Sequence, residues 1–161
     1  MKKLVLFLLL SLLLLCSASV GYCSGTLTEQ DGFETYMGKS KSIVRIISPY
    51  YQETADGKTY LVDSLTTGND GFLGLVVNFD ENDVVNCVNI QMDPDTVKRD
   101  YDGDIYKVFS FSIFALGLDS ADILGIKEDE DGLWALLKGS IGCVCTHTEN
   151  FYYVSCINMT E

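Results

Sequence analysis

Three side chains that can bind metals or carry out redox chemistry stand two residues apart near the end of the chain. They are Cys143, Cys145 and His147, and Cys156 follows them. On a β-strand, alternate residues project from the same face, so these three side chains would share one face. Thiolates together with an imidazole can hold zinc or copper, and an exposed thiolate can react. The group therefore permits either a metal site or thiol chemistry.

The same cysteines also fit a structural disulfide bond. The stretch 140–158 has the pattern of a β-hairpin that turns at residues 149–150, and this turn puts Cys143 opposite Cys156. The two residues would form a non-hydrogen-bonded pair, where the Cα atoms come close enough for a disulfide. We therefore predict a Cys143–Cys156 bond as the leading pair.

The neighbouring positions of this hairpin follow from the same turn. Cys145 would lie opposite Val154, and His147 opposite Tyr152. A second bond between Cys87 and Cys145 requires their strands to be neighbours. The Cys-x-Cys-x-His spacing differs from the usual zinc knuckle, and an oxidising compartment favours disulfides. We therefore predict no metal and no cofactor, and keep Cys143, Cys145, His147 and Cys156 as the metal candidates of the alternative hypothesis.

The beginning of the chain predicts the compartment. Lys2 and Lys3 precede an apolar run from Leu4 to Leu15, and small residues follow. This layout is typical of a secretory signal peptide. We predict a signal peptide over 1–23, cleaved between about residues 19 and 24, and a single exported domain over 24–161. The expected location is secreted or periplasmic.

Membrane attachment is not expected. A lipid anchor would need small residues immediately before the acylated cysteine, but Leu15 precedes Cys16 and Tyr22 precedes Cys23. No second apolar run is long enough to span a bilayer. We predict neither a lipid anchor nor a membrane span.

The charge of the chain limits the partners that it attracts. It carries 23 acidic and 11 basic residues, a formal net charge of −12 with its histidine neutral. Such a field repels nucleic acid and anionic lipid, and it favours solubility and basic partners. We expect no nucleic-acid binding, and we consider a basic protein the fitting partner.

Hydrophobic periodicity predicts both strands and helices. In the hairpin over 73–92, we expect Leu75 opposite Val88 and Cys87 opposite Val76. Asp56-Gly57 is a hairpin turn signal. We expect helices over 29–37, 105–116 and 130–138, with a helical turn within 120–126. We expect strands over 42–48, 59–65, 73–79 and 84–92, and in the hairpin 140–158. The stretch 93–104 is expected to be an acidic loop. These elements predict an α+β fold, a mainly antiparallel sheet of about six strands built from hairpins, with two or three helices packed on one face.

The predicted function follows from the compartment, the cysteines and the absence of catalytic motifs. The sequence contains no phosphate-binding loop, no nucleophile elbow and no zinc-protease motif. We predict a non-enzymatic protein-binding or inhibitor-like module, whose contact candidates are its edges and the acidic stretches 80–83, 93–104 and 128–131. The alternative is a metal- or thiol-active protein that uses the cysteine and histidine face.

Overall fold

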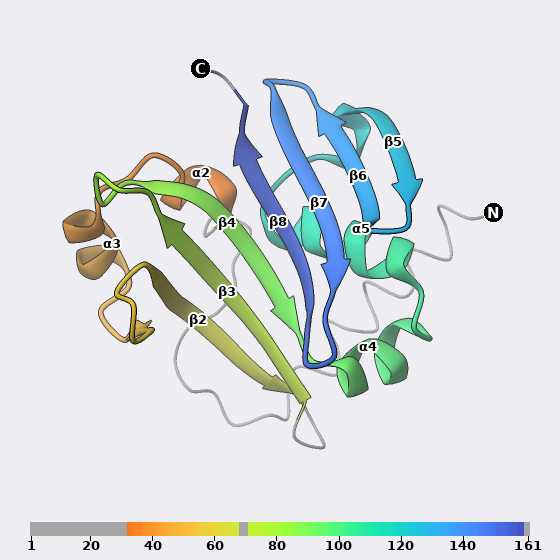
Figure 1. Cartoon of the computed structure of the whole chain (residues 1–161), viewed down its shortest axis with the longest axis horizontal. Coiled ribbons are helices and arrows are strands. Elements are labelled where there is room, and N and C mark those ends of the chain that lie inside the picture. The colour runs from red at the N-terminus through yellow and green to blue at the C-terminus, as the bar shows by residue number, and fades with distance from the viewer. Residues whose placement is uncertain (1–31, 68–70, 160–161) are drawn as a thin grey trace.

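The chain forms two layers, an antiparallel sheet and a set of helices that cover one of its faces (Figure 1). The computed structural model describes residues 32–67 and 71–159. The predicted α+β fold is confirmed, but within these ranges the sheet has eight strands rather than about six, and there are four α-helices. The predicted signal peptide lies outside the described residues. None of the helices in these ranges is long and apolar enough to cross a bilayer.

Every neighbouring pair of strands is antiparallel, and the sheet order is β1-β2-β3-β4-β8-β7-β6-β5. The helices are α2 (Phe33–Tyr36), α3 (Lys41–Ile47), α4 (Pro94–Tyr101) and α5 (Ile105–Ala115), with a 3-10 turn η2 (Ser120–Asp122). The strands are β1 (Gln52–Glu53), β2 (Thr59–Thr67), β3 (Gly71–Phe79), β4 (Val85–Met92), β5 (Ile123–Asp129), β6 (Gly132–Leu137), β7 (Ile141–His147) and β8 (Tyr152–Asn158).

The two halves of the described chain share one topology. Two helices, α2 and α3, precede the meander β1–β4, and two further helices, α4 and α5, precede the meander β5–β8. The two meanders meet at their last strands, because β4 pairs with β8 in antiparallel orientation. This arrangement leaves β1 and β5 as the two edges of the sheet. This repeat of topology was not predicted from the sequence.

The core lies between the helices and one face of the sheet. A single row of paired residues crosses five strands, and all its members are buried: Val77, Val88, Cys156, Cys143 and Ala135. Helix α5 packs on β6, β7 and β8, whereas α2 contacts β4 and α4 contacts β3. One continuous hydrophobic cluster joins side chains of all four helices to this face. No helix of residues 32–67 and 71–159 covers the opposite face of the sheet, which is called the open face below.

The predicted strand over 42–48 is wrong, because these residues form helix α3. Only Val44 of this helix is fully buried, while Ile46 is largely exposed. Lys41 and Arg45 stand one helical turn apart, so both can reach the same hairpin. These tertiary contacts override the strand preference of the β-branched residues. The expected Asp56-Gly57 turn is present, with φ of +66° at Gly57, but its first strand is the short β1.

The predicted helix over 130–138 is also wrong. The chain turns at residues 130–131 and returns as β6, which pairs with β5. Leu133, Ala135 and Leu137 point into the core, whereas Trp134 and Leu136 lie on the open face. Because both sets are apolar, the run shows no alternation of apolar and polar residues, and it cannot be told from a buried helix by pattern. Within the expected helical turn over 120–126, only η2 is helical.

The expected acidic loop over 93–104 contains helix α4. Asp93 caps this helix by accepting a hydrogen bond from the Thr96 backbone N–H at 2.9 Å, and Pro94 occupies its first position. Asp102 ends the helix in the left-handed conformation, with Gly103 after it. The sequence contains these capping residues, but the acidic composition of the stretch led to the prediction of a loop. Of the helix expected over 29–37, the described part is helical only in α2, and the expected helix over 105–116 is confirmed as α5.

The hairpin β3–β4 keeps its predicted faces but not its predicted register. Leu75 lies opposite Ile90 instead of Val88, and Cys87 lies opposite Asn78 instead of Val76. A shift of two residues leaves the side chains from Cys87 to Met92 on their expected faces, but the expected face of Val85 is wrong. A bulge follows Asn78 and brings Val85 into the core.

Candidate functional site

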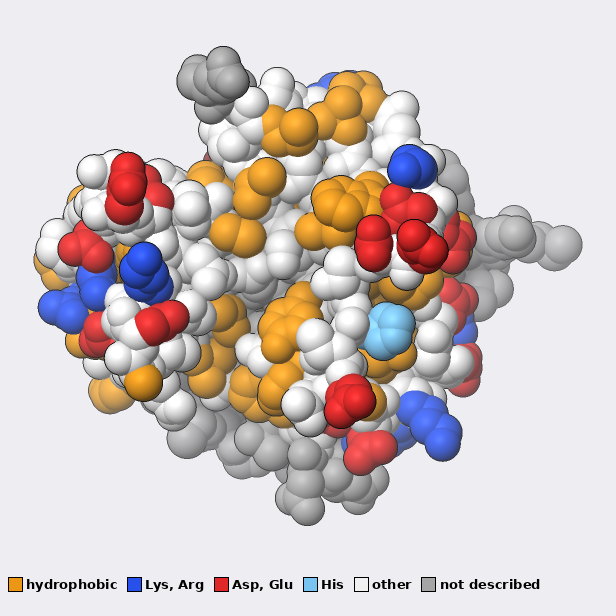
Figure 2. Space-filling model, in the orientation of Figure 1, with side chains coloured by type: hydrophobic (Ala, Val, Ile, Leu, Met, Phe, Trp, Pro, Cys, Tyr) orange, Lys and Arg blue, Asp and Glu red, His pale blue; other side chains and the backbone are white. Residues whose placement is uncertain are grey.

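The open face of the second half of the sheet is hollowed because glycines alternate there with large apolar residues. Reading from β5 to β8, one row of paired residues is Gly125, Leu136, Gly142 and Ile157. The next row is Lys127, Trp134, Val144 and Ser155. Together these residues line a hollow of about 560 Å³, which we call the sheet hollow. Figure 2 shows hydrophobic side chains gathered over this part of the sheet.

The glycines explain why the hollow is there. A Cβ atom added at Gly125 would meet no atom within 4 Å, and one at Gly142 would meet the flexible end of Met159. The first half of the sheet shows the contrast. There a Cβ at Gly74 would lie 2.6 Å from the Phe72 ring and 2.8 Å from Leu61. The space over Gly74 is thus filled by the protein itself, whereas the space over Gly125 is open.

The rim of the hollow consists of large apolar side chains that water reaches. Trp134 is 45% exposed and Leu124 is 62% exposed. Five such residues line the hollow: Leu124, Trp134, Leu136, Ile157 and Met159. Single exposed apolar residues are normal on protein surfaces, but a contiguous group marks a contact surface. This group therefore marks the sheet hollow as a candidate contact surface.

Acidic residues border the hollow at the β5–β6 turn. The stretch 128–131 contains four consecutive acids, and acidic side chains crowd this margin in Figure 2. Asp129 accepts hydrogen bonds from Trp134 Nε1 at 3.2 Å and from Lys127 Nζ at 2.9 Å. The Lys127 ammonium is the main cause that lowers the pKa of Asp129. Asp129 therefore stays ionised and fixes the indole at the edge of the hollow.

The predicted pairing of the last hairpin is confirmed. Cys143 lies opposite Cys156, Cys145 opposite Val154 and His147 opposite Tyr152. Backbone hydrogen bonds join Thr148 to Phe151 and Met159 to Ser140, and because the type of pair alternates, Cys143 and Cys156 form a non-hydrogen-bonded pair. Their thiols contact each other inside the core. The disulfide itself stays a prediction.

The remaining members of the cysteine and histidine group, Cys145 and His147, differ in their exposure to solvent. Cys145 is fully buried, whereas His147 is exposed and stacks on Tyr152 with ring centroids 5.3 Å apart. Cys87 lies on the open face beside Asn89, with β8 between its strand and β7. Strand order and face therefore do not favour a Cys87–Cys145 bond, which also stays a prediction.

The buried thiols are poor metal ligands and poor nucleophiles in this state. Burial raises the pKa of Cys145 to about 12. The hydrogen bond with Cys143, together with burial, raises the pKa of Cys156 well above that of an ordinary thiol. Since thiolates rather than thiols bind metals and react, these shifts oppose both roles. Among the residues that the structure describes, no three His, Cys, Asp or Glu side chains are grouped so that they could hold a metal ion.

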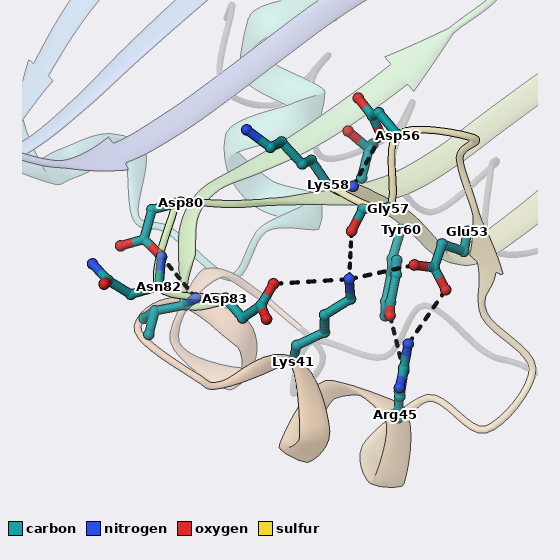
Figure 3. Close-up of polar contacts among 12 residues, drawn as sticks. Lys41, Arg45, Glu53, Asp56, Gly57, Lys58, Tyr60, Asp80, Asn82 and Asp83 are labelled. Atoms are coloured by element: carbon teal, nitrogen blue, oxygen red, sulfur yellow. Dashed lines mark hydrogen bonds and ion pairs between the residues drawn. The ribbon is translucent and has the colours of Figure 1, made fainter.

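A second cluster of charges, drawn in Figure 3, attaches helix α3 to the first half of the sheet. Lys41 donates to the Gly57 carbonyl at 2.5 Å and pairs with Glu53 at 3.3 Å. Arg45 donates to the Tyr60 hydroxyl at 2.8 Å and also reaches Glu53. Each cation has an acidic partner within the cluster, so its contacts are satisfied internally. We assign it a structural role.

Comparison with protein-family models, with curated proteins and with solved structures found no match to this chain.

Of this site, the sequence predicted the acidic border but not the apolar hollow. Of the acidic contact candidates, 128–131 borders the hollow, while 93–104 forms α4 and 80–83 forms the β3–β4 turn beside Lys41. Trp134, Leu136 and Gly142 were not named. The run that contains Trp134 and Leu136 was expected to be a helix, and four strands must lie side by side before the hollow exists. The spacing of Gly125 and Gly142 gave no signal by itself.

Proposed function

We propose that this protein is a non-enzymatic exported module that binds a basic protein partner through the sheet hollow. The observation that carries the proposal is the apolar hollow beside the edge strand β5, where a Cβ atom added at Gly125 would meet no described atom within 4 Å. Filling this hollow would remove apolar rim side chains from water, and such burial drives most protein association. The hollow belongs to a rigid sheet, so binding needs no ordering of a loop.

The charges beside the hollow support the choice of a basic partner. The acids at 128–131 adjoin the rim, and the chain as a whole is strongly acidic. Opposite charges at the margin of an apolar contact steer the encounter and help to reject acidic proteins. An apolar segment that carries lysine or arginine therefore matches both the hollow and its border.

The only tryptophan of the chain makes this proposal directly testable, because Trp134 lies in the rim and its fluorescence reports on the hollow. We would titrate the protein with a short synthetic peptide in which valine and lysine alternate. The same peptide with glutamate in place of lysine is the charge control. We expect the lysine peptide to shift the emission of Trp134 to shorter wavelength, with an affinity that falls as salt rises.

Filling the hollow is the decisive perturbation. Gly125→Leu puts a side chain into open space and should weaken the lysine peptide by about tenfold or more. Ser110→Leu adds the same side chain at an exposed position of α5 and should leave binding unchanged. Equal affinities for the two variants, or equal binding of the lysine and glutamate peptides, would contradict the proposal.

A further inference from the structure

We infer that the partner segment binds as an additional strand at the β5 edge, with alternate side chains lying over the sheet hollow. This inference rests on the proposed function and specifies its mode. A strand added to a sheet edge gains affinity from backbone hydrogen bonds and specificity from side-chain pockets. The protein offers both features side by side, because the edge strand β5 also forms one wall of the hollow.

The two edges of the sheet differ in what they offer. Strand β1 has two residues, which is too short to direct a partner, whereas β5 has seven. The β5–β6 hairpin has a two-residue turn and closes with the pair Asp129 and Gly132. Because hydrogen-bonded and non-hydrogen-bonded pairs alternate from that closing pair, the backbone groups of Ile126 and Glu128 point away from β6. Among the described residues, no strand pairs with the outer side of β5, so it presents backbone donors and acceptors as edge strands do.

The side chains around β5 set the chemistry of the added strand. On the helix side, Glu128 accepts a hydrogen bond from the Tyr106 hydroxyl of α5. On the open face, Gly125 leaves room beside Leu136, where an apolar side chain of the added strand would be buried. Acids follow at the end of β5. The fitting segment is therefore extended, apolar at alternate positions and basic where it passes the β5–β6 turn.

A second copy of this chain fits the edge less well. The register of β5 is irregular between Ile123 and Gly125, and Lys127 stands within the strand. Irregular register and a lysine are devices that oppose pairing between identical edges. Each copy would also bring the same acidic turn and a net charge of −12, which repels a like chain. A basic partner meets neither obstacle.

The test separates strand addition from simple filling of the hollow. Ile126→Pro removes one outward backbone donor without removing a hydrogen bond to β6, and the preceding Gly125 has no Cβ to clash with the proline ring. Ile126→Ala removes the same side chain but keeps the donor, so it is the matched control. The probe is the lysine and valine peptide, followed by Trp134 fluorescence, together with the same peptide N-methylated at alternate residues. Circular dichroism of both variants confirms that the sheet is retained.

Strand addition predicts that Ile126→Pro binds the peptide about tenfold more weakly than Ile126→Ala, and that N-methylation in one of the two alternating frames causes a similar loss. Equal affinities of the two variants, with no effect of N-methylation in either frame, would overturn the inference. If Gly125→Leu still prevented binding in that case, the hollow would remain the binding site and only the mode would be wrong. Loss of the effect of Gly125→Leu as well would overturn both proposals.

Discussion

A bond between Cys143 and Cys156 is the prediction that the structure specifies most closely. The two residues face each other on β7 and β8 as a non-hydrogen-bonded pair, and their thiols touch in the core. In an oxidising compartment such a pair is expected to close. The bond would form a loop of about 14 residues, for which restricting the unfolded chain corresponds to about 3 kcal/mol.

The measurement compares the free energy of unfolding of the oxidised protein with that of the same protein under reductant. We expect the urea midpoint to fall on reduction by an amount equivalent to about 3 kcal/mol. A Cys143→Ala/Cys156→Ala double variant should not respond to reductant. Cys145→Ala is the control that should retain the full response, because Cys145 lies opposite Val154 and takes no part in this bond.

Intact mass with thiol alkylation, before and after reduction, identifies the bonds independently. Protection of Cys143 and Cys156 until reduction is the expected result. Alkylation of both thiols in unreduced, denatured protein would refute the reasoning, and so would a wild-type stability that reductant leaves unchanged. A mass excess that matches a bound metal would instead favour the alternative hypothesis of a metal-active protein.

Three further substitutions test contacts that hold the elements together. Asp93→Ala removes the acceptor for the N–H groups of Thr96 and Phe72 and should lower the free energy of unfolding by about 1–2 kcal/mol, measured by urea denaturation. Burial opposes ionisation of Asp93, but these hydrogen bonds outweigh burial and lower the pKa of its carboxyl group. The stabilisation by Asp93 is therefore complete above the ordinary pKa of an aspartate and is lost as the pH falls through the lowered pKa. The acid-unfolding midpoint of Asp93→Ala should accordingly differ from that of the wild-type protein. Gly32→Ala would put a Cβ 2.0 Å from the Leu116 carbonyl oxygen and should cost about 1–3 kcal/mol in the same assay. Gly125→Ala meets no atom and should unfold at nearly the wild-type urea concentration.

The parts of the fold that the sequence predicts well are those in which local chemistry determines the geometry. The β7–β8 register follows from a single turn, and the pairing of Cys143 with Cys156 follows from counting outward. Helix α5 follows from spacing and from Asp104, which caps it. In the β3–β4 hairpin the faces from Cys87 to Met92 are as predicted although the register moved by two residues, because side-chain direction depends only on parity, whereas the bulge after Asn78 reverses the expected face of Val85.

The parts that the sequence does not predict depend on neighbours that are distant in the chain. The stretch 42–48 is rich in β-branched residues and becomes helical because Lys41 and Arg45 are held by the β1–β2 hairpin. Strand β6 is apolar on both faces, since one face meets α5 and the other lines the hollow. When both faces of a strand are apolar, its sequence does not show whether the second face is buried in a core or forms a binding surface.

Because the two halves of the sheet share one topology, their open faces can be compared position by position. Both halves use a helix pair and a four-stranded meander, so both present an open face with a glycine in it. In the first half, Phe72 and Leu61 close the space over Gly74, and Asn89 and Asn78 join through a hydrogen bond nearby. In the second half Met159 fills the space over Gly142, the counterpart of Gly74, whereas no described atom closes the space over Gly125 in the edge strand β5. The open part of the hollow therefore lies at the β5 edge and depends on the glycine there. That half also carries the long free edge and the acidic turn, so the three features that a basic strand requires lie on the same half of the sheet.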